Sequence, residues 1–242
     1  MSLEAVIFDW GGTLTPWHTI DLAEQWRVFA RVYATEDIGG YPDGGAQLAD
    51  RMLAAEREAW GRLRESGASA RLADVFEAVG VRSDHPGHDA ARVAYEEFWE
   101  PHTYLDPDVP ELFAGLRERG LRVGVLSNTI WTRDYHRGLF GRDGILDLID
   151  GDVYSSEIPY VKPHPEAFAA AVAAVGGSSA TNCVYVGDRI YEDVHGAQRA
   201  GLRAIHVPHS DIPLDQQVPV EVRPDGTAQR LLDVLKIVDE WL

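Results

Sequence analysis

Four short apolar runs constrain the fold of this chain more than any other feature of its sequence. They are Ala5–Phe8, Arg122–Leu126, Cys183–Val186 and Ala204–Val207. Each run is rich in valine or isoleucine and is bounded by polar or turn-forming residues, a pattern typical of strands buried on both faces of a parallel sheet. Asp152–Ser155 is a fifth, weaker candidate strand. We therefore predict a parallel sheet at the centre of the protein.

Helical patterns alternate with these runs. Apolar residues recur at helical spacing in four segments: Pro110–Arg119, His164–Val175, Glu192–Ala200 and Thr227–Trp241. A strand followed by a helix, repeated along the chain, predicts that helices cover both faces of the sheet. The expected fold class is thus α/β, with a Rossmann-like parallel-sheet core.

The sequence between about Trp17 and Pro101 departs from this alternation. Four successive helical patterns occupy it: Asp21–Thr35, Ala46–Glu65, Arg71–Val79 and Asp89–Trp99. We predict that residues 17–101 form an all-helical cap domain over the carboxyl edge of the sheet, and that residues 1–16 and 102–242 form the α/β core domain. The alternative, in which these helices simply extend the main core, is less favoured because nearly every strand candidate lies outside the segment.

The formal net charge of −17 argues against two classes of partner. Nucleic acids and anionic membrane surfaces are both bound through basic faces, which so acidic a chain does not favour. Cys183 is the single cysteine and lies in an apolar run, so we expect it to pack in the core and expect no disulfide-linked partner. Neither a signal-peptide pattern nor an apolar run of about 18 residues is visible, so the expected location is the cytoplasm.

Polar side chains follow the predicted strands at the points where the strands end. Asp9 follows the first run, Ser127 and Asn128 follow the second, and Asp188 follows the third. Lys162, one of only two lysines in the chain, precedes a predicted helix. Taken singly, Asp188 fits a turn aspartate and Lys162 a solvated surface charge. Because ligands of an open parallel sheet bind outside the carboxyl ends of its strands, we expect these side chains to converge on one site.

The carboxylates of this set indicate phosphoryl chemistry. Asp9 and Asp188 together can hold a hard cation such as Mg²⁺, which takes oxygen ligands. A carboxylate can also attack phosphorus and form an aspartyl-phosphate, and Asp9 is our candidate for this nucleophile.

Donors to a phosphoryl group accompany these carboxylates. The backbone N–H groups of Gly11, Gly12 and Thr13 can approach phosphate oxygens closely, because glycine has no side chain to prevent it. Ser127 and Lys162 supply a hydroxyl donor and a positive charge for the transferring group.

This constellation resembles the four motifs of the haloacid dehalogenase superfamily, most of whose members are magnesium-dependent phosphatases. The motifs occur in the family's order: Asp9-Trp10-Gly11-Gly12-Thr13-Leu14, Ser127, Lys162-Pro163 and Gly187-Asp188-Arg189-Ile190-Tyr191-Glu192-Asp193. The match spans nearly the whole chain, and the helical insertion lies where one branch of the family carries a cap.

The resemblance implies a role for each motif residue. Asp9 would be the nucleophile, assisted by Ser127 and Lys162. The ligands of Mg²⁺ would be Asp9, Asp188, the backbone carbonyl of Gly11, and Asp193 as a ligand or as a support for the others. The phosphoryl group of a small phosphorylated substrate would be held by Ser127, Asn128 and Lys162.

Gly11 departs from the family pattern. Family phosphatases carry a second aspartate there, two positions after the nucleophile, as general acid and base. The carbonyl at Gly11 is retained, but the proton donor for the leaving group is absent, and general acid–base catalysis is worth about 10²–10⁴ in rate. His18, Asp21 and Asp134 are candidates for a substitute acid.

Several functions could account for a glycine at position 11 in place of the family's second aspartate. A phosphatase that favours good leaving groups, such as aryl or acyl phosphates, is the preferred interpretation. A 2-haloacid dehalogenase needs no such proton, but family dehalogenases typically have tyrosine at this position and lack the metal-binding fourth motif. Phosphonate cleavage, which in the resembled family needs a cap lysine to form a Schiff base, is rejected because the predicted cap contains no lysine. A catalytically retired protein that binds a phosphorylated ligand is the non-enzymatic alternative.

The glycine-rich segment Gly39–Gly45 within the predicted cap is ambiguous. A flexible cap loop of this kind can close over a substrate and exclude water, and so set specificity. An ordinary connection between two helices would have the same composition, and the sequence does not choose between the two.

Overall fold

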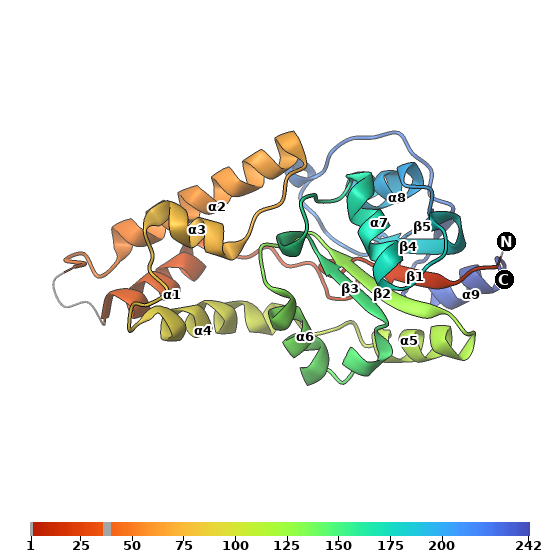
Figure 1. Cartoon of the computed structure of the whole chain (residues 1–242), viewed down its shortest axis with the longest axis horizontal. Coiled ribbons are helices and arrows are strands. Elements are labelled where there is room, and N and C mark those ends of the chain that lie inside the picture. The colour runs from red at the N-terminus through yellow and green to blue at the C-terminus, as the bar shows by residue number, and fades with distance from the viewer. Residues whose placement is uncertain (1, 36–39) are drawn as a thin grey trace.

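Six parallel strands form a single sheet at the centre of the protein. The computed structural model describes residues 2–35 and 40–242. The strands are β1 (Ala5–Phe8), β2 (Arg122–Ser127), β3 (Gly151–Tyr154), β4 (Cys183–Gly187), β5 (Arg203–His206) and β6 (Gly226–Thr227). Their order across the sheet is β3-β2-β1-β4-β5-β6 (Figure 1). The predicted α/β class with a Rossmann-like parallel sheet is therefore confirmed.

The register of the sheet places three strand ends side by side. Phe8 at the end of β1 pairs with Val125 of β2 on one side and with Val186 of β4 on the other. The residues that follow these positions therefore emerge at the same edge of the sheet. The candidate site residues after β1, β2 and β4 are brought together in this way.

Helices cover both faces of the sheet. They are α5 (Val109–Glu118), α6 (Arg133–Arg142), α7 (Pro165–Ala174), α8 (Gly196–Arg199) and α9 (Asp233–Asp239). Side chains of β1 alternate between the two faces: Val6 and Phe8 pack with α5, α6 and α9, whereas Ala5 and Ile7 pack with α7 and α8. This alternation follows from the two-residue period of a strand, and it explains why every residue of β1 is apolar.

The remaining helices form a separate bundle beyond one end of the sheet (Figure 1). They are α1 (Leu22–Thr35), α2 (Ala46–Ser66), α3 (Leu72–Val79) and α4 (His88–Trp99). We call this group the helical unit. It has its own aromatic core, in which Trp26 stacks on Tyr95 with ring centroids 4.4 Å apart and Phe29 stacks on Phe76 at 5.1 Å. Trp26 is thus a core residue of the helical unit, and its indole N–H donates to buried Glu56 (2.7 Å).

Some elements differ from the sequence-based predictions. The last helix begins at Asp233 rather than at Thr227, because Gly226 and Thr227 pair with β5 as the edge strand β6. The predicted helix Glu192–Ala200 is a π-helix over Ile190–His195 followed by the short α8. Helix α6 was not predicted, since polar residues dominate its sequence. Within the described residues, no helix combines the length and hydrophobicity that a membrane span requires.

The close packing of β3 against α7 gives a first prediction. A Cβ atom on Gly151 would lie 2.4 Å from the carbonyl oxygen of Ala174, and backbone cannot move aside as a flexible side chain can. We expect Gly151→Ala to cost about 1–3 kcal/mol of stability. That cost corresponds to a melting temperature lower by roughly 2–4 °C per kcal/mol, measured by circular dichroism.

Gly141 provides the matched control for this prediction. It lies in helix α6, and a Cβ there would meet nothing within 4 Å. Gly141→Ala should therefore stabilise the protein slightly, by about 0.5–1 kcal/mol. A Gly151→Ala protein as stable as the wild type would show that β3 and α7 do not pack as described.

Candidate active site

Asp9 stands immediately after β1 and opens a tight turn. Its backbone N–H donates to Val186 of β4 (2.9 Å), which continues the sheet by one residue, and its side chain is buried. Gly12 in the turn has φ of +89°, and a Cβ there would lie 2.4 Å from Oδ2 of Asp188. Only glycine allows the turn to approach Asp188 so closely.

The turn uses its own donors internally. The N–H of Gly12 donates to the carbonyl of Thr15 (2.9 Å), and that of Thr13 donates to the carbonyl of Trp10 (3.3 Å). The side-chain hydroxyl of Thr13 donates to Oδ1 of Asp188 (3.2 Å). In this structure the N–H groups of Gly12 and Thr13 therefore bind carbonyls of the turn, and the hydroxyl of Thr13 binds the turn to Asp188.

Lys162 connects the parts of the site. Its ammonium, which is almost completely buried, donates to Oδ1 of Asp9 (2.6 Å), to Oδ1 of Asp193 (2.7 Å) and to the hydroxyl of Tyr185 (2.8 Å). All three donors of the ammonium group are thus used. The hydroxyl of Tyr185 in turn donates to the carbonyl of Leu126 in β2 (3.0 Å).

Asn128 fixes the backbone that carries Lys162. Its amide nitrogen donates to the carbonyl of Lys162 (3.0 Å), and its amide oxygen accepts from the N–H of Lys162 (2.8 Å). Both ends of the amide are therefore occupied, which favours a positioning role over the predicted contact with phosphate. Ser127, the last residue of β2, is buried at the same sheet edge, next to Asn128.

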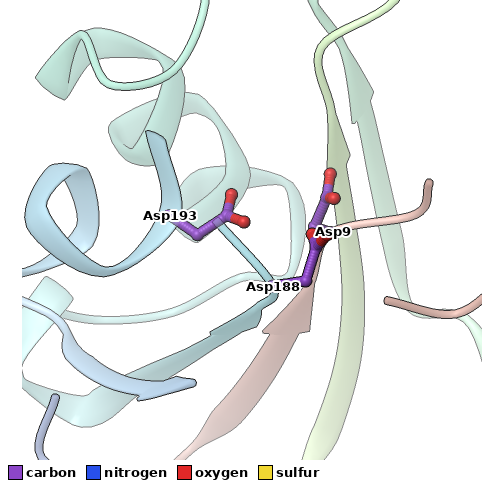
Figure 2. A group of neighbouring side chains, drawn as sticks. All are labelled: Asp9, Asp188 and Asp193. Atoms are coloured by element: carbon purple, nitrogen blue, oxygen red, sulfur yellow. The ribbon is translucent and has the colours of Figure 1, made fainter. Parts of the chain in front are cut away.

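Three buried carboxylates gather around this lysine. One oxygen from each of Asp9, Asp188 and Asp193 lies within 4.8 Å of the other two (Figure 2). Asp193 reaches the group from the π-helix that follows β4, and a Cβ on Gly187 would lie 2.4 Å from its carboxyl carbon. Its second oxygen accepts from the N–H of Arg189 (2.9 Å).

The electrostatics of this cluster suit a divalent cation. Burial raises the pKa of Asp9 to about 6, although neighbouring Lys162 acts in the opposite direction. Burial and the charges of Asp9 and Asp193 raise the pKa of Asp188 to about 8. Burial alone would lower the pKa of Lys162, but the carboxylates of Asp193 and Asp9 raise it to about 12.

The carboxylate cluster has excess negative charge, and one oxygen of Asp188 is where it lacks a partner in the described part of the chain. Three carboxylates face one ammonium, so the ionised cluster holds more negative than positive charge. Among the described residues, no donor forms a hydrogen bond with the buried Oδ2 of Asp188, and such a group is costly to leave unpaired. Asp9 and Asp188 therefore fit the oxygen ligands that Mg²⁺ prefers, whereas Asp193 already accepts hydrogen bonds at both oxygens and supports Lys162.

Sequence reasoning missed three residues around the site. Tyr185 is a hydroxyl in the middle of the otherwise apolar strand β4, which was its only signal. His209 and Ser210 follow β5 and contact the carbonyl of Gly12 at 2.8 and 2.5 Å. These two stand beyond the carboxyl end of a predicted strand, so the rule that located Asp9 also applies to them.

The three candidate substitute acids lie elsewhere. His18 is exposed and its ring packs on His102 at 4.8 Å between centroids. Asp21 accepts from the N–H of Glu24 (3.1 Å) at the start of α1, and Asp134 is exposed in the first turn of α6. Within the described residues, none of the three forms a hydrogen bond or ion pair with the carboxylate cluster.

The segment that joins α2 to α3 contacts residues next to the site, a contact that was not predicted from the sequence. The carbonyl of Gly67 accepts from Val161, next to Lys162, and Ser69 donates to Pro159, both at 3.1 Å. The N–H of Leu72 donates to Ile130, close to Ser127 (2.9 Å).

The predicted specificity loop Gly39–Gly45 is placed differently. Gly39 lies outside the described residues. The end of α1 and the beginning of α2, which this segment joins, lie on the side of the helical unit away from the sheet (Figure 1). Hydrogen bonds of residues 43–45 are local, as in Gly44 N–H to Tyr41 (3.0 Å). The structure thus favours an ordinary helix connection.

Two comparisons of the sequence with known proteins agree with the predicted family. The family model of haloacid dehalogenase-like hydrolases matches residues 3–201. The chain is 30% identical to the glyceraldehyde 3-phosphate phosphatase of Methanopyrus kandleri over 207 residues, which are 85% of this chain and 84% of that protein.

Solved structures share the fold at lower identity. A phosphatase of this family from Thermococcus onnurineus superimposes with a TM-score of 0.63 at 23% identity, covering 98% of both chains. A 2-haloacid dehalogenase from Pseudomonas syringae superimposes with a TM-score of 0.67 at 20% identity, covering 99% of this chain and 100% of that one. The fold alone therefore does not distinguish the two chemistries.

The raised carboxyl pKa values predict a pH dependence of stability. Asp9 and Asp188 bind protons more tightly in the folded state than at their ordinary value of 3.8. Between pH 3.8 and these raised pKa values, the folded protein therefore binds more protons than the unfolded protein does. Its free energy of unfolding thus falls as pH rises toward 8. In EDTA, the melting temperature should decline between pH 5.5 and 8. Adding Mg²⁺ should raise it more at pH 8 than at pH 5.5.

Two variants distinguish the pH dependence caused by this cluster from that caused by other titrating groups. Asp188→Asn should flatten the decline and weaken the response to Mg²⁺, whereas Asp50→Asn, at an exposed position in α2, should keep both. An Asp188→Asn protein with the wild-type pH profile and the wild-type magnesium response would contradict this description of the cluster.

Proposed function

Because the chain belongs to the haloacid dehalogenase-like hydrolases, we propose that it is a magnesium-dependent phosphatase for a small phosphorylated metabolite, acting through an aspartyl-phosphate on Asp9. One observation carries the proposal. The carboxylate of Asp9 shares a buried site with the ammonium of Lys162 at 2.6 Å and with the unpartnered oxygen of Asp188. A nucleophile, a phosphate-binding cation and a metal-ligand oxygen are thus side by side.

Asp9 performs the first chemical step. A carboxylate oxygen attacks phosphorus, the bond from phosphorus to the ester oxygen breaks, and the leaving group departs with the bonding electrons. Water then attacks the aspartyl-phosphate, releases inorganic phosphate and regenerates the carboxylate. With a pKa of about 6, Asp9 is mostly ionised at pH 7 and above, as a nucleophile must be.

Lys162 and Ser127 position the phosphoryl group. The ammonium of Lys162 keeps its charge because the neighbouring carboxylates raise its pKa to about 12. Its contacts with Asp193 and Tyr185 hold Nζ beside Asp9, where charge develops during transfer. Asp9, Asp188 and the carbonyl of Gly11 would hold Mg²⁺, which supplies charge neutralisation and Lewis acidity at a phosphoryl oxygen.

Gly11 determines which leaving groups are handled well. A Cβ on Gly11 would meet none of the described atoms within 4 Å, so a side chain could begin there without a clash, and the glycine itself supplies no acid. In the described part of the chain, His18, Asp21 and Asp134 also form no hydrogen bond or ion pair with the cluster. We therefore assign to the enzyme substrates whose leaving groups need little protonation, such as aryl or acyl phosphates.

The carboxylate cluster also favours phosphate over halide chemistry. The dehalogenase alternative shares the fold and explains Gly11, but it gives no role to Asp188, a second buried carboxylate beside Asp9 with an oxygen suited to a cation. The retired-protein alternative likewise leaves the buried network around Lys162 without a chemical purpose.

Restoring the missing acid tests the proposal. The space beside Gly11 admits a larger side chain, and its φ is not in the left-handed region. We expect wild type to hydrolyse 4-nitrophenyl phosphate much faster than an alkyl phosphate in the presence of Mg²⁺. Gly11→Asp should raise alkyl phosphate turnover by about 10²–10⁴ and aryl turnover far less, measured as phosphate release.

Controls define the outcomes that count against each part. Asp9→Asn should abolish both activities, and activity that survives this change would refute the nucleophile assignment. Equal wild-type rates on aryl and alkyl phosphates would refute the role given to Gly11. Halide release from 2-chloropropionate without any phosphate release would favour the dehalogenase alternative.

A further inference from the structure

Arg189 is a charged residue at the site to which the proposed reaction gives no role. It follows Asp188, and its own N–H donates to Asp193 (2.9 Å). The side chain leaves the cluster, and its guanidinium lies over the ring of Trp17, 4.8 Å from the centroid. One guanidinium nitrogen donates to the carbonyl of Gln216 (3.2 Å). The remaining N–H groups of the fork have no partner among the described residues.

Arg189, like Arg203, has no carboxylate partner among the described residues, although other half-buried arginines of this chain pair with one. Arg133 pairs with Asp152 at 2.9 Å, and Arg142 pairs with Asp143 at 2.7 Å. Among the described residues, no carboxylate lies within ion-pair distance of Arg189, although Asp188 is adjacent in sequence. Its positive charge acts on the carboxylates of Glu192 and Asp188, whose pKa values it lowers against the larger, raising effect of burial.

Trp17, whose ring lies beneath this guanidinium, carries a second unused donor. Its indole N–H is buried and has no acceptor in the described part of the chain. Buried N–H donors normally have a partner, because leaving one unpaired costs about 1–3 kcal/mol. Among the described residues, the guanidinium of Arg189 and the indole N–H of Trp17 thus belong to two neighbouring side chains without an anionic partner, and Arg189 directly follows Asp188 of the cluster.

We infer that Arg189 and Trp17 form an anion-binding subsite that receives a second acidic group, a carboxylate or phosphate, on the same small substrate. The inference rests on the proposed function and narrows its substrate class to phosphorylated acids and bisphosphates. A planar guanidinium binds either group through two parallel hydrogen bonds, and the indole N–H adds a third. Trp17 belongs to the segment that leads into α1, so the second acidic group also contacts the entry to the helical unit.

Binding of stable phosphonates tests the subsite without requiring turnover. Phosphonoacetate and 3-phosphonopropionate carry a carboxylate, whereas methylphosphonate does not. In calorimetric titrations in the presence of Mg²⁺, wild type should bind phosphonoacetate or 3-phosphonopropionate roughly 10- to 100-fold more tightly than methylphosphonate. This difference is expected for charge-assisted hydrogen bonds to the carboxylate. Arg189→Met should remove most of this preference, and Arg189→Lys, which keeps charge but not the fork, should restore part of it.

Arg203 provides the matched control. It is also half-buried, lacks a carboxylate partner in the described residues, and lies 5.0 Å over a tryptophan ring, that of Trp241. It stands at the start of β5, the opposite edge of the sheet from the site. Arg203→Met should therefore retain the wild-type preference for carboxylates.

The outcomes separate this inference from the proposed function. Equal binding of all three phosphonates by wild type, or an unchanged preference in folded Arg189→Met, would overturn the subsite whatever the catalytic activity. A carboxylate preference that depends on Arg189, in a protein that hydrolyses no phosphate ester, would support the subsite and overturn the proposed function.

Discussion

The candidate site depends on one buried ammonium group, that of Lys162. A lysine so far from water is stable only if opposite charges and acceptors surround it, and this one has two carboxylates and a phenol. The same contacts determine the state of its partners, because the ammonium favours ionised Asp9 while burial opposes ionisation. Lys162 thus holds Asp9, the proposed nucleophile, in place, favours its ionised form and keeps a positive charge beside it.

The parallel sheet makes this arrangement possible. β1 lies between β2 and β4, so the residues after three neighbouring strands reach one edge. Lys162 comes from a loop outside the sheet, and Asn128 binds the backbone of that loop to the end of β2. The helical unit contacts the same loop at Val161, so the segment that carries the lysine joins both parts of the protein.

Much of this arrangement could be predicted from the sequence, because buried strands and the residues after them have a short-range signature. Asp9, Asp188, Asp193 and Lys162 were all predicted, and they meet in the structure. Features set by long-range contacts were not predictable. The edge strand β6 has two residues and no apolar pattern, and Tyr185 has a role only because Lys162 arrives beside it. The N–H groups of Gly12 and Thr13 were predicted to face phosphate, but the turn binds them internally.

The central claim is that Asp9 carries the phosphoryl group during turnover. Rapid acid quenching of the enzyme with an aryl phosphate and Mg²⁺, followed by peptic digestion at low pH and mass spectrometry, tests it directly. We predict a phosphoryl group on the peptide that contains Asp9, and none on that peptide from Asp9→Asn. Phosphate release with no phosphorylated peptide, or with the phosphoryl group on another residue, would contradict the account.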